Sequence, residues 1–185
     1  LLSRKEEQDG LRRKLGWKPE MPTLLAVGSK RVERLAETLN VINHFGFPLQ
    51  LAIVTGRDET LYSQLSQVEW HVPVHLYDFV QNIPEMMHAS DAVVCKAGGL
   101  IVTESLAAGK PLMLIDVLPG QERGNAELVV NSGAGDLAET DLDVLQTLAH
   151  WLADDGKLLR MRASCANALG KPMAAYEAAE QTVQA

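Results

Sequence analysis

Two adjacent glycines, Gly98 and Gly99, follow an apolar run and come directly before a stretch of helical character that carries a glutamate, Glu104. Glycine leaves the backbone N–H groups uncovered, and the first N–H groups of a helix attract anions together with the positive end of the helix dipole. The segment "KAGGLIVTES" therefore predicts a phosphate or diphosphate site at the start of a helix. The alternative is that the glycines only form a tight turn between a strand and a helix.

Glu104 falls one to two turns inside that helix. An acidic side chain near a helix N-terminus is stabilised by about 0.3 to 1 kcal/mol without any ligand, which is the simple structural interpretation. A carboxylate beside a diphosphate is poorly placed to bind phosphate, but it can accept two hydrogen bonds from a ribose diol. A bound nucleotide would explain the glycines and the glutamate together.

A second polar segment, "PGQERGN", follows the next apolar run and places Gln121, Glu122 and Asn125 at the start of another helix. The simple interpretation is an ordinary Pro-Gly loop with a first-turn acid. If this loop shares a sheet edge with the glycine pair, however, its polar side chains can bind sugar hydroxyls.

Two familiar phosphate signatures do not fit. A Walker loop ends in Gly-Lys-Ser/Thr, whereas Gly109 and Lys110 are followed by Pro111. The first strand leads into "VGSKRVER", which has Gly28 but lacks the second and third glycines of a dinucleotide fingerprint. The sequence therefore argues against a P-loop and against a standard NAD site.

The elements that position these loops alternate regularly along the chain. Apolar runs that read as strands are "TLLAVG", "LQLAIVTG", "PVHLYDF", "DAVVCK", "PLMLID" and a weak "GAGDLA", and helical stretches are expected at 31–45, 59–67, 83–88, 101–108, 122–131 and 141–154. Strands that are apolar on both faces and separated by helices indicate a parallel sheet covered on each side. We predict an α/β, Rossmann-like, doubly wound domain with a six-stranded, mostly parallel sheet, whose ligands bind at the carboxyl ends of the strands.

Three segments are expected. Residues 1–22 form a helix and a linker, residues 23–155 form the nucleotide-binding domain, and residues 156–185 form C-terminal helices around a break at "GKP". Ala174, Ala175, Ala178 and Ala179 would give the last helix a face of small residues, which could cover the sheet or pack on a neighbouring domain. The chain begins without Met, so we expect it to be a piece of a longer protein.

Composition narrows the class of partner. The 185 residues carry a net charge of -7, which argues against a general nucleic-acid binder because such binding rests on clustered Lys and Arg. Cys95 and Cys165 form no zinc spacing or disulfide framework, which fits a reducing compartment. No signal peptide or membrane-spanning run is evident. We expect a cytoplasmic protein.

With these motifs in order, the chain resembles the donor-binding C-terminal domain of GT-B glycosyltransferases. It is most similar to the family of monogalactosyldiacylglycerol synthases and processive diacylglycerol glucosyltransferases, and more distantly to the lipid II GlcNAc transferase. The similarity covers roughly residues 23–135 and is carried by "KAGGLIVTESLAAGKP" and "PGQERGN", with support from "VTGRDETL" and "YDFVQNIPEMMHASDAVVCKAGG".

The resemblance implies roles for particular residues. Gly98, Gly99, Leu100 and Ile101 would bind the donor diphosphate, and Glu104 the ribose. Gln121 and Glu122 would contact the donor sugar, with Asn125 following them in the motif. Phe79 and Val80 would lie against uracil. Gly28 and Ser29 match the first glycine-rich loop, in which Lys30 and Arg31 replace the usual glycines, and Arg57 falls where a polar donor-site residue is common.

The family transfers galactose or glucose from UDP-galactose or UDP-glucose to diacylglycerol with inversion. The resemblance implies that backbone N–H groups meet the charge of the UDP leaving group, so neither a metal nor a cofactor is expected. It places the acceptor pocket, the membrane-contacting surface and the general base in an N-terminal domain that precedes this chain, so that the full-length protein would associate peripherally with a membrane and this chain alone would be inactive.

Two alternatives stay open. UDP-GlcNAc 2-epimerases share the two-domain architecture, although "PGQERGN" is not their pattern. A non-catalytic nucleotide-binding module would have the same fold without turnover. His71 and His75, four residues apart, are interpreted as ordinary histidines rather than metal ligands.

Overall fold

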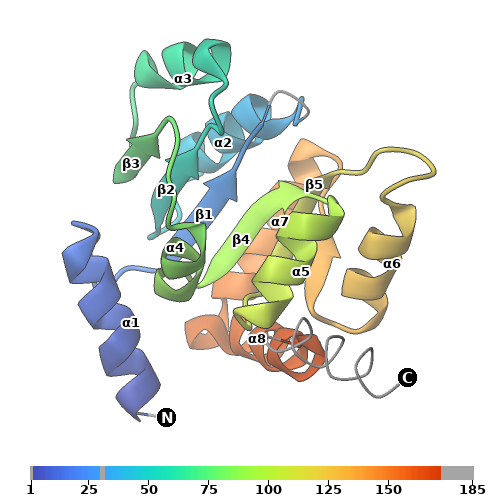
Figure 1. Cartoon of the computed structure of the whole chain (residues 1–185). Coiled ribbons are helices and arrows are strands. Elements are labelled where there is room, and N and C mark those ends of the chain that lie inside the picture. Colours follow the sequence, from blue (N-terminus) through green and yellow to red (C-terminus); the bar gives the residue numbers. More distant parts are fainter. Residues whose placement is uncertain (1, 30–31, 172–185) are drawn as a thin grey trace, which may run out of the picture.

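A computed structural model describes residues 2–29 and 32–171 of the chain. Its centre is a six-stranded sheet in the order β3-β2-β1-β4-β5-β6 (Figure 1). The strands are β1 (Thr23–Val27), β2 (Gln50–Val54), β3 (Val74–Tyr77), β4 (Ala92–Lys96), β5 (Leu112–Asp116) and β6 (Gly135–Leu137). Each pair of neighbouring strands is parallel, so the prediction of a mostly parallel six-stranded sheet is confirmed and the sheet is parallel throughout.

Helices α2 to α6 connect successive strands, α1 precedes the first strand, and α7 and α8 follow the last. They are α1 (Leu2–Lys14), α2 (Leu35–His44), α3 (Glu59–Ser66), α4 (Ile83–Ala89), α5 (Gly99–Ala107), α6 (Arg123–Asn131), α7 (Asp141–Leu152) and α8 (Lys157–Leu169), with a short 3-10 turn (Asp154–Gly156) between the last two. The alternation of strand and helix gives the doubly wound arrangement that the sequence predicts.

The helix boundaries differ from the predicted ones by up to four residues. Helix α2 begins at Leu35 rather than at position 31, and the described residues Glu33 and Arg34 before it form a turn. Helix α7 ends at Leu152 rather than at 154, because Asp154 and Asp155 adopt positive φ angles of 48° and 54° that a helix does not allow.

A hydrophobic core lies on each face of the sheet. One core is closed by α2, α3 and α7, the other by α1, α4, α5 and α6, and α8 contributes to both. In Figure 1, α4, α5 and α6 lie in front of the sheet and α2 and α7 lie behind it. The core strands β1, β2, β4 and β5 are buried almost completely, which accounts for their lack of apolar and polar alternation in the sequence.

The edge strand β6 is short and starts at a glycine for a steric reason. A Cβ on Gly135 would lie 2.1 Å from Leu112 O of the neighbouring strand. The two backbones approach too closely for any side chain there, which explains why "GAGDLA" is a weak strand signal.

A buried arginine fixes the first helix to the amino-terminal edge of the sheet, which is the side at which the parallel strands begin. The carboxyl edge is the opposite side, at which the strands end. Arg12 is 4% exposed and donates to Ala89 O, to Pro19 O and to Asp91 Oδ2, each at 2.7 Å. Asp91 Oδ2 also accepts from Thr23 N at 2.7 Å. Helix α1 therefore packs beside α4 as part of this domain, and its attachment is largely polar.

At the other end of the chain, α8 packs against α5 and α7. The predicted small-residue face of Ala174, Ala175, Ala178 and Ala179 lies outside the described residues. Within the two described ranges, no helix is long and apolar enough to span a membrane.

Candidate functional site

Strands β1 and β4 lie side by side in the middle of the sheet, although they are far apart in the sequence. The chain leaves β1 toward α2 on one face of the sheet and leaves β4 toward α5 on the other. The strand order reverses at this point, and a crevice outside the carboxyl ends of the two strands is where such sheets bind ligands. The loops that carry Gly28 and the Gly98–Gly99 pair therefore flank the expected ligand position.

The glycine pair is not required by backbone geometry. Neither Gly98 nor Gly99 has a positive φ, and Gly98, with φ -67° and ψ 139°, is the N-cap of α5. A Cβ on Gly98 would meet nothing closer than 3.4 Å, and one on Gly99 nothing closer than 3.7 Å. Since the turn itself would tolerate alanine at both positions, what the glycines provide is uncovered backbone at the start of a helix.

The first turn of α5 has no side-chain cap. Gly98 O accepts the first helical bond from Val102 N at 3.0 Å, which leaves the N–H groups of the residues before Val102 without a helical partner. The side chain of Leu100 is 75% exposed and that of Ile101 is half-buried against the core. The predicted diphosphate residues thus form a bare, outward-facing helix start that suits an anion.

Glu104 occupies the next turn of the same helix and is half-buried. Its neighbours bind back to their own helix: Thr103 Oγ1 donates to Gly99 O at 2.7 Å and Ser105 Oγ to Ile101 O at 2.7 Å. No residue in the described part of the chain donates to the Glu104 carboxylate. Glu104 can therefore accept two hydrogen bonds from a ligand without breaking a contact of the protein.

The loop between β5 and α6 carries the three predicted sugar residues in different environments. Gln121 is exposed, and its side chain has no partner among the residues that the structure describes. Glu122 is 6% exposed; it forms an ion pair with Lys96, and its Oε2 accepts from Leu118 N at 3.0 Å. Asn125 Nδ2 donates to Ala97 O at 2.9 Å, which links α6 to the loop that holds the glycine pair. Of the three, Gln121 alone presents an unused side chain.

Lys96 is a residue of this site without a predicted role. It is the last residue of β4, two positions before Gly98, and its side chain is 18% exposed. The signal for it was present, because a lysine ends an otherwise apolar strand at the carboxyl edge. Complete burial, with a smaller contribution from the carboxylate of Glu122, raises the pKa of the neighbouring Cys95 thiol to about 12, which makes that cysteine unreactive.

The first loop is shaped by packing. A Cβ on Gly28 would lie 2.7 Å from Leu35 Cδ2 and 3.0 Å from Leu61 Cδ2, and Gly28 N already donates to Val54 O at 2.8 Å. Ser29 is half-exposed beside it, and positions 30 and 31 lie outside the described residues. The Gly28 N–H group is therefore not available as a donor for the predicted contact with the diphosphate.

Arg57 and Phe79 come together at the carboxyl ends of β2 and β3. The Arg57 guanidinium lies over the Phe79 ring, 4.0 Å from its centroid, and the ring is 48% exposed. Arg57 has a positive φ of 67°, a conformation that costs a non-glycine residue free energy and is concentrated at functional loops. Val80 packs into the core under the same loop. The structure thus joins two residues that were predicted separately.

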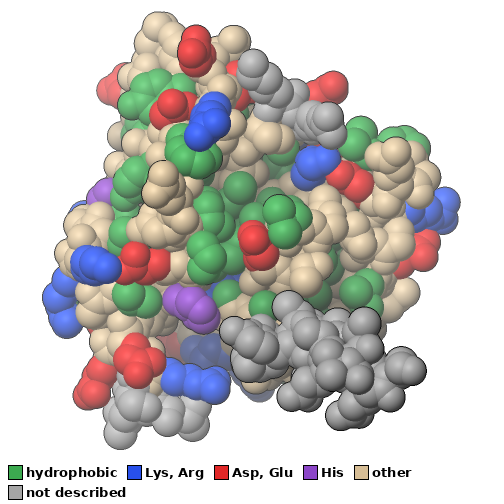
Figure 2. All heavy atoms as spheres, in the orientation of Figure 1, with side chains coloured by type: hydrophobic (Ala, Val, Ile, Leu, Met, Phe, Trp, Pro, Cys, Tyr) green, Lys and Arg blue, Asp and Glu red, His purple; other side chains and the backbone are tan. Residues whose placement is uncertain are grey.

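The face on which α1, α4, α5 and α6 lie has an apolar centre. Figure 2 shows hydrophobic side chains gathered in the middle of this face, where α4, β4 and α5 lie in Figure 1. The half-buried hydrophobic residues of this layer include Tyr77, Val80, Ile83 and Ile101. A surface of this kind can pack against a planar ring, and it adjoins the start of α5.

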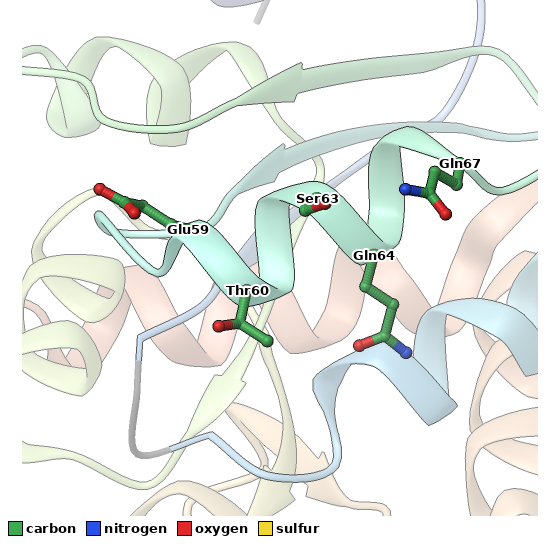
Figure 3. A pocket seen from close by; sticks show the side chains of 5 residues that line it. All are labelled: Glu59, Thr60, Ser63, Gln64 and Gln67. Atoms are coloured by element: carbon green, nitrogen blue, oxygen red, sulfur yellow. The ribbon is translucent and has the colours of Figure 1, made fainter.

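A surface hollow of about 560 Å³ lies elsewhere, along α3. Its lining residues all come from this one helix or its end, and Figure 3 shows their side chains spread along it; they are Glu59, Thr60, Ser63, Gln64 and Gln67. None of the predicted donor-site residues lines it, and an open hollow without groups that converge on one point is a poor ligand site.

Within residues 2–29 and 32–171, no group of three or more His, Cys, Asp or Glu side chains could hold a metal ion. His75 stacks near Trp17, with 6.1 Å between ring centroids, and His71 packs edge-on against His44 at 5.2 Å. Burial and the nearby Lys18 lower the pKa of His75. Both histidines make ring contacts typical of structural side chains.

Comparison with known proteins identifies the family to which the chain belongs. Residues 24–181 match the model of the glycosyltransferase family 28 C-terminal domain, and the chain belongs to this family. It is 32% identical over 179 residues to a probable monogalactosyldiacylglycerol synthase 3, chloroplastic, of Oryza sativa, covering 92% of this chain and 35% of the relative. It is 30% identical to monogalactosyldiacylglycerol synthase 1, chloroplastic, of Arabidopsis thaliana, covering 90% and 33%. The chain thus spans about a third of the length of these relatives.

Solved structures agree on the fold. MurG of Acinetobacter baumannii superposes with a TM-score of 0.74 at 19% identity, over 98% of this chain and 53% of that one. The S. aureus MnaA-UDP co-structure superposes with a TM-score of 0.68 at 14% identity, over 89% and 45%. The predicted Rossmann-like, GT-B type domain is confirmed, as is the resemblance to the monogalactosyldiacylglycerol synthases.

Proposed function

We propose that this chain is the UDP-sugar-binding half of an inverting glycosyltransferase that transfers galactose or glucose to diacylglycerol. The observation that carries the proposal is the carboxyl edge at β4. There a bare helix start, a Glu104 without a partner among the described residues and an exposed Gln121 lie at the point where the strand order reverses. The names of relatives such as the monogalactosyldiacylglycerol synthases of Oryza sativa and Arabidopsis thaliana support the reaction class.

In this proposal the N–H groups at the start of α5 bind the donor diphosphate. Glu104 accepts from the two ribose hydroxyls, and the apolar centre of the face receives the uracil near Val80 and Phe79. The α5 N-terminus then lies where negative charge grows as the bond from C1 of the sugar to the UDP oxygen breaks, and preorganised N–H groups stabilise such charge. No cofactor or metal ion takes part in the proposed reaction.

The acceptor side of the reaction is assigned to residues outside this chain. The diacylglycerol hydroxyl oxygen attacks C1 from the face opposite UDP, its proton passes to a general base, and UDP leaves. The base, the lipid pocket and the surface that meets the cytoplasmic side of a membrane would belong to the remaining two thirds of a protein as long as the relatives. By itself, the chain is expected to bind the donor without transferring the sugar.

The first test is UDP binding to the 185-residue chain, measured by titration calorimetry. Glu104→Ala is expected to weaken UDP binding by roughly tenfold, because two hydrogen bonds to a charged acceptor are lost. Glu37→Ala is the matched control, since Glu37 is an exposed glutamate on α2, which covers the opposite face of the sheet. No heat of binding at millimolar UDP would contradict the proposal.

The second test concerns the reaction. The longer polypeptide that contains this chain is incubated with radiolabelled UDP-galactose or UDP-glucose and vesicles of diacylglycerol and phospholipid, and the lipid phase is counted. Transfer of label to lipid supports the proposal. Donor binding with an epimerised sugar nucleotide as the product would assign an isomerase, and binding without any product would assign a non-catalytic module.

A further inference from the structure

We propose that Lys96 is a positioning residue for the donor sugar and that Glu122 acts as a clip for the loop rather than as a direct sugar ligand. This inference rests on the proposed function, since it concerns how the same site tells UDP-sugar from UDP. It departs from the role that resemblance implies for Glu122.

Both carboxylate oxygens of Glu122 already have a partner within the protein. One carboxylate oxygen is taken by the Lys96 ammonium and the other by Leu118 N. Its own backbone N–H also donates to Leu118 O at 3.1 Å. Glu122 therefore ties Leu118 from both its side chain and its main chain, and this closes residues 118–122 into a fixed turn.

The turn places Gln121 outward. Between the two tied residues lie Pro119, Gly120 and Gln121, all of them exposed, with Gly120 at a φ of 84° that favours glycine. With Glu122 held inward, Gln121 is the polar side chain that the turn presents. An amide has both donors and an acceptor, so it can bind sugar hydroxyls of either kind.

Strand β4, which supplies Lys96, is irregular at that residue. The register between β4 and β5 shifts at this residue: Cys95 pairs with Leu114, but Lys96 pairs with Asp116. Bulges of this kind redirect a side chain and are common next to active sites. The register shift therefore lies at the residue that pairs with Glu122, and Lys96 does not continue the regular pairing of Val93, Val94 and Cys95.

The Lys96–Glu122 clip also contacts the loop that carries Gly98. A Cβ on Gly98 would lie 3.4 Å from Lys96 Cε and 3.6 Å from Glu122 Oε1, so the ion pair lies against the open side of Gly98. Asn125 Nδ2 donates to Ala97 O, which gives a second tie between the two loops. The loop that meets the diphosphate and the loop that meets the sugar are thereby held in one fixed relation.

The experiment compares UDP with UDP-galactose and UDP-glucose on the 185-residue chain by calorimetry, at a temperature where thermal unfolding shows every variant to be folded. Lys96→Met is expected to weaken both UDP-sugars about tenfold, because a misplacement of about 1 Å removes well-oriented contacts, and to change UDP affinity by less than about twofold. Lys157→Met is the control, since Lys157 is an exposed lysine at the start of α8.

The double variant Lys96→Met with Glu122→Met separates positioning from packing. Replacing both side chains with methionine leaves no unpaired buried charge, but Leu118 N loses its acceptor and the clip is absent, so the loss of UDP-sugar affinity is expected to persist. Recovery of wild-type UDP-sugar binding in the double variant would overturn the inference, because the pair would then serve packing alone.

Two further results would also overturn it. If Lys96→Met binds UDP-sugar as tightly as the unchanged chain or more tightly, the released Glu122 is itself a ligand or the clip has no role. If the affinities for UDP and for UDP-sugar fall equally, the substitution acts on binding of the diphosphate and not on binding of the sugar. Absence of UDP binding to the unchanged chain would instead contradict the proposed function and remove the basis of this inference with it.

Discussion

The two edges of the parallel sheet use polar side chains in opposite ways. At the amino-terminal edge, Arg12 and Asp91 are joined to each other and to backbone groups, and Gln50, which is fully buried, donates to Lys18 O at 2.6 Å and accepts from Lys18 N at 2.9 Å. At the carboxyl edge, Glu104 and Gln121 have no partner within the described ranges.

This difference separates structural from functional polarity. Buried polar groups cost free energy unless they are paired. A network in which every polar group has a partner therefore stabilises the fold and leaves no group for a ligand. Unpaired polar groups beside a bare helix start cost little while water reaches them, and they are available to a ligand. The Lys96–Glu122 pair lies at the carboxyl edge but belongs to the first kind, which is why we assign it to positioning.

The largest expected effect is at the amino-terminal edge. Arg12→Met removes the guanidinium from four oxygen acceptors and leaves Asp91 without its salt-bridge partner, so the free energy of unfolding should fall by about 3 to 5 kcal/mol. Urea denaturation followed by circular dichroism measures this change. Arg13→Met, at an exposed position of the same helix, should change stability by less than about 0.5 kcal/mol.

The same variant tests whether the amino-terminal edge affects ligand binding at the carboxyl edge. The affinity of folded Arg12→Met for UDP should equal that of the unchanged chain, because Arg12 lies at the end of the sheet away from the ligand crevice. A clear loss of UDP affinity in a fully folded sample would show that the two edges are coupled.

A smaller effect is expected at the carboxyl edge, and it should appear in binding. Gly99→Ala would cover part of the bare helix start while meeting no protein atom closer than 3.7 Å. UDP affinity should fall about tenfold, and stability should change by no more than about 1 kcal/mol. Calorimetry and urea denaturation measure the two quantities on one preparation.

Gly28→Ala provides the contrast within the same edge. Its Cβ would press on Leu35 and Leu61, so it should lower the free energy of unfolding by about 1 to 3 kcal/mol. If Gly99→Ala proved as destabilising as Gly28→Ala, the glycine pair would serve the fold rather than a ligand.

Much of the fold could be predicted because its signals are local. The buried strands β1, β2, β4 and β5 are apolar on both faces, and nothing but a covered parallel sheet explains that pattern. The loops at the carboxyl edge follow from the strand ends, so the positions of Gly98 and Gln121 in the fold were predictable. The contacts of these residues with a donor remain predictions.

What could not be predicted depends on pairing across the chain. Lys96 and Glu122 are 26 residues apart, and Arg12 and Asp91 are 79 apart. A single sequence gives the charge of each side chain, but the partner follows only from how loops and helices pack. For the same reason the burial of Glu122, which changes its expected role, was invisible in "PGQERGN".

A pH dependence of stability is expected at the amino-terminal edge. Burial, with a smaller contribution from Arg12, lowers the pKa of Lys110 from 10.5 to about 8, against an opposing effect of Asp91. The folded protein therefore releases this proton near pH 8, whereas the unfolded chain keeps it to about 10.5. Since the unfolded state binds more protons in this window, the contribution of Lys110 to the free energy of unfolding should rise with pH between these two values.

Urea denaturation of the unchanged chain and of Lys110→Met at several pH values from 7.5 to 10 measures this rise as a difference between the two proteins. Cys95 titrates in the opposite sense above pH 9, because its pKa is raised to about 12 in the folded state, but it is present in both proteins and cancels. The stability of the unchanged chain should gain on that of the variant as pH increases. A constant difference would show that Lys110, which donates to the carbonyl oxygens of His88 and Ser90, keeps an ordinary pKa, and that the amino-terminal edge is less enclosed than its saturated network indicates.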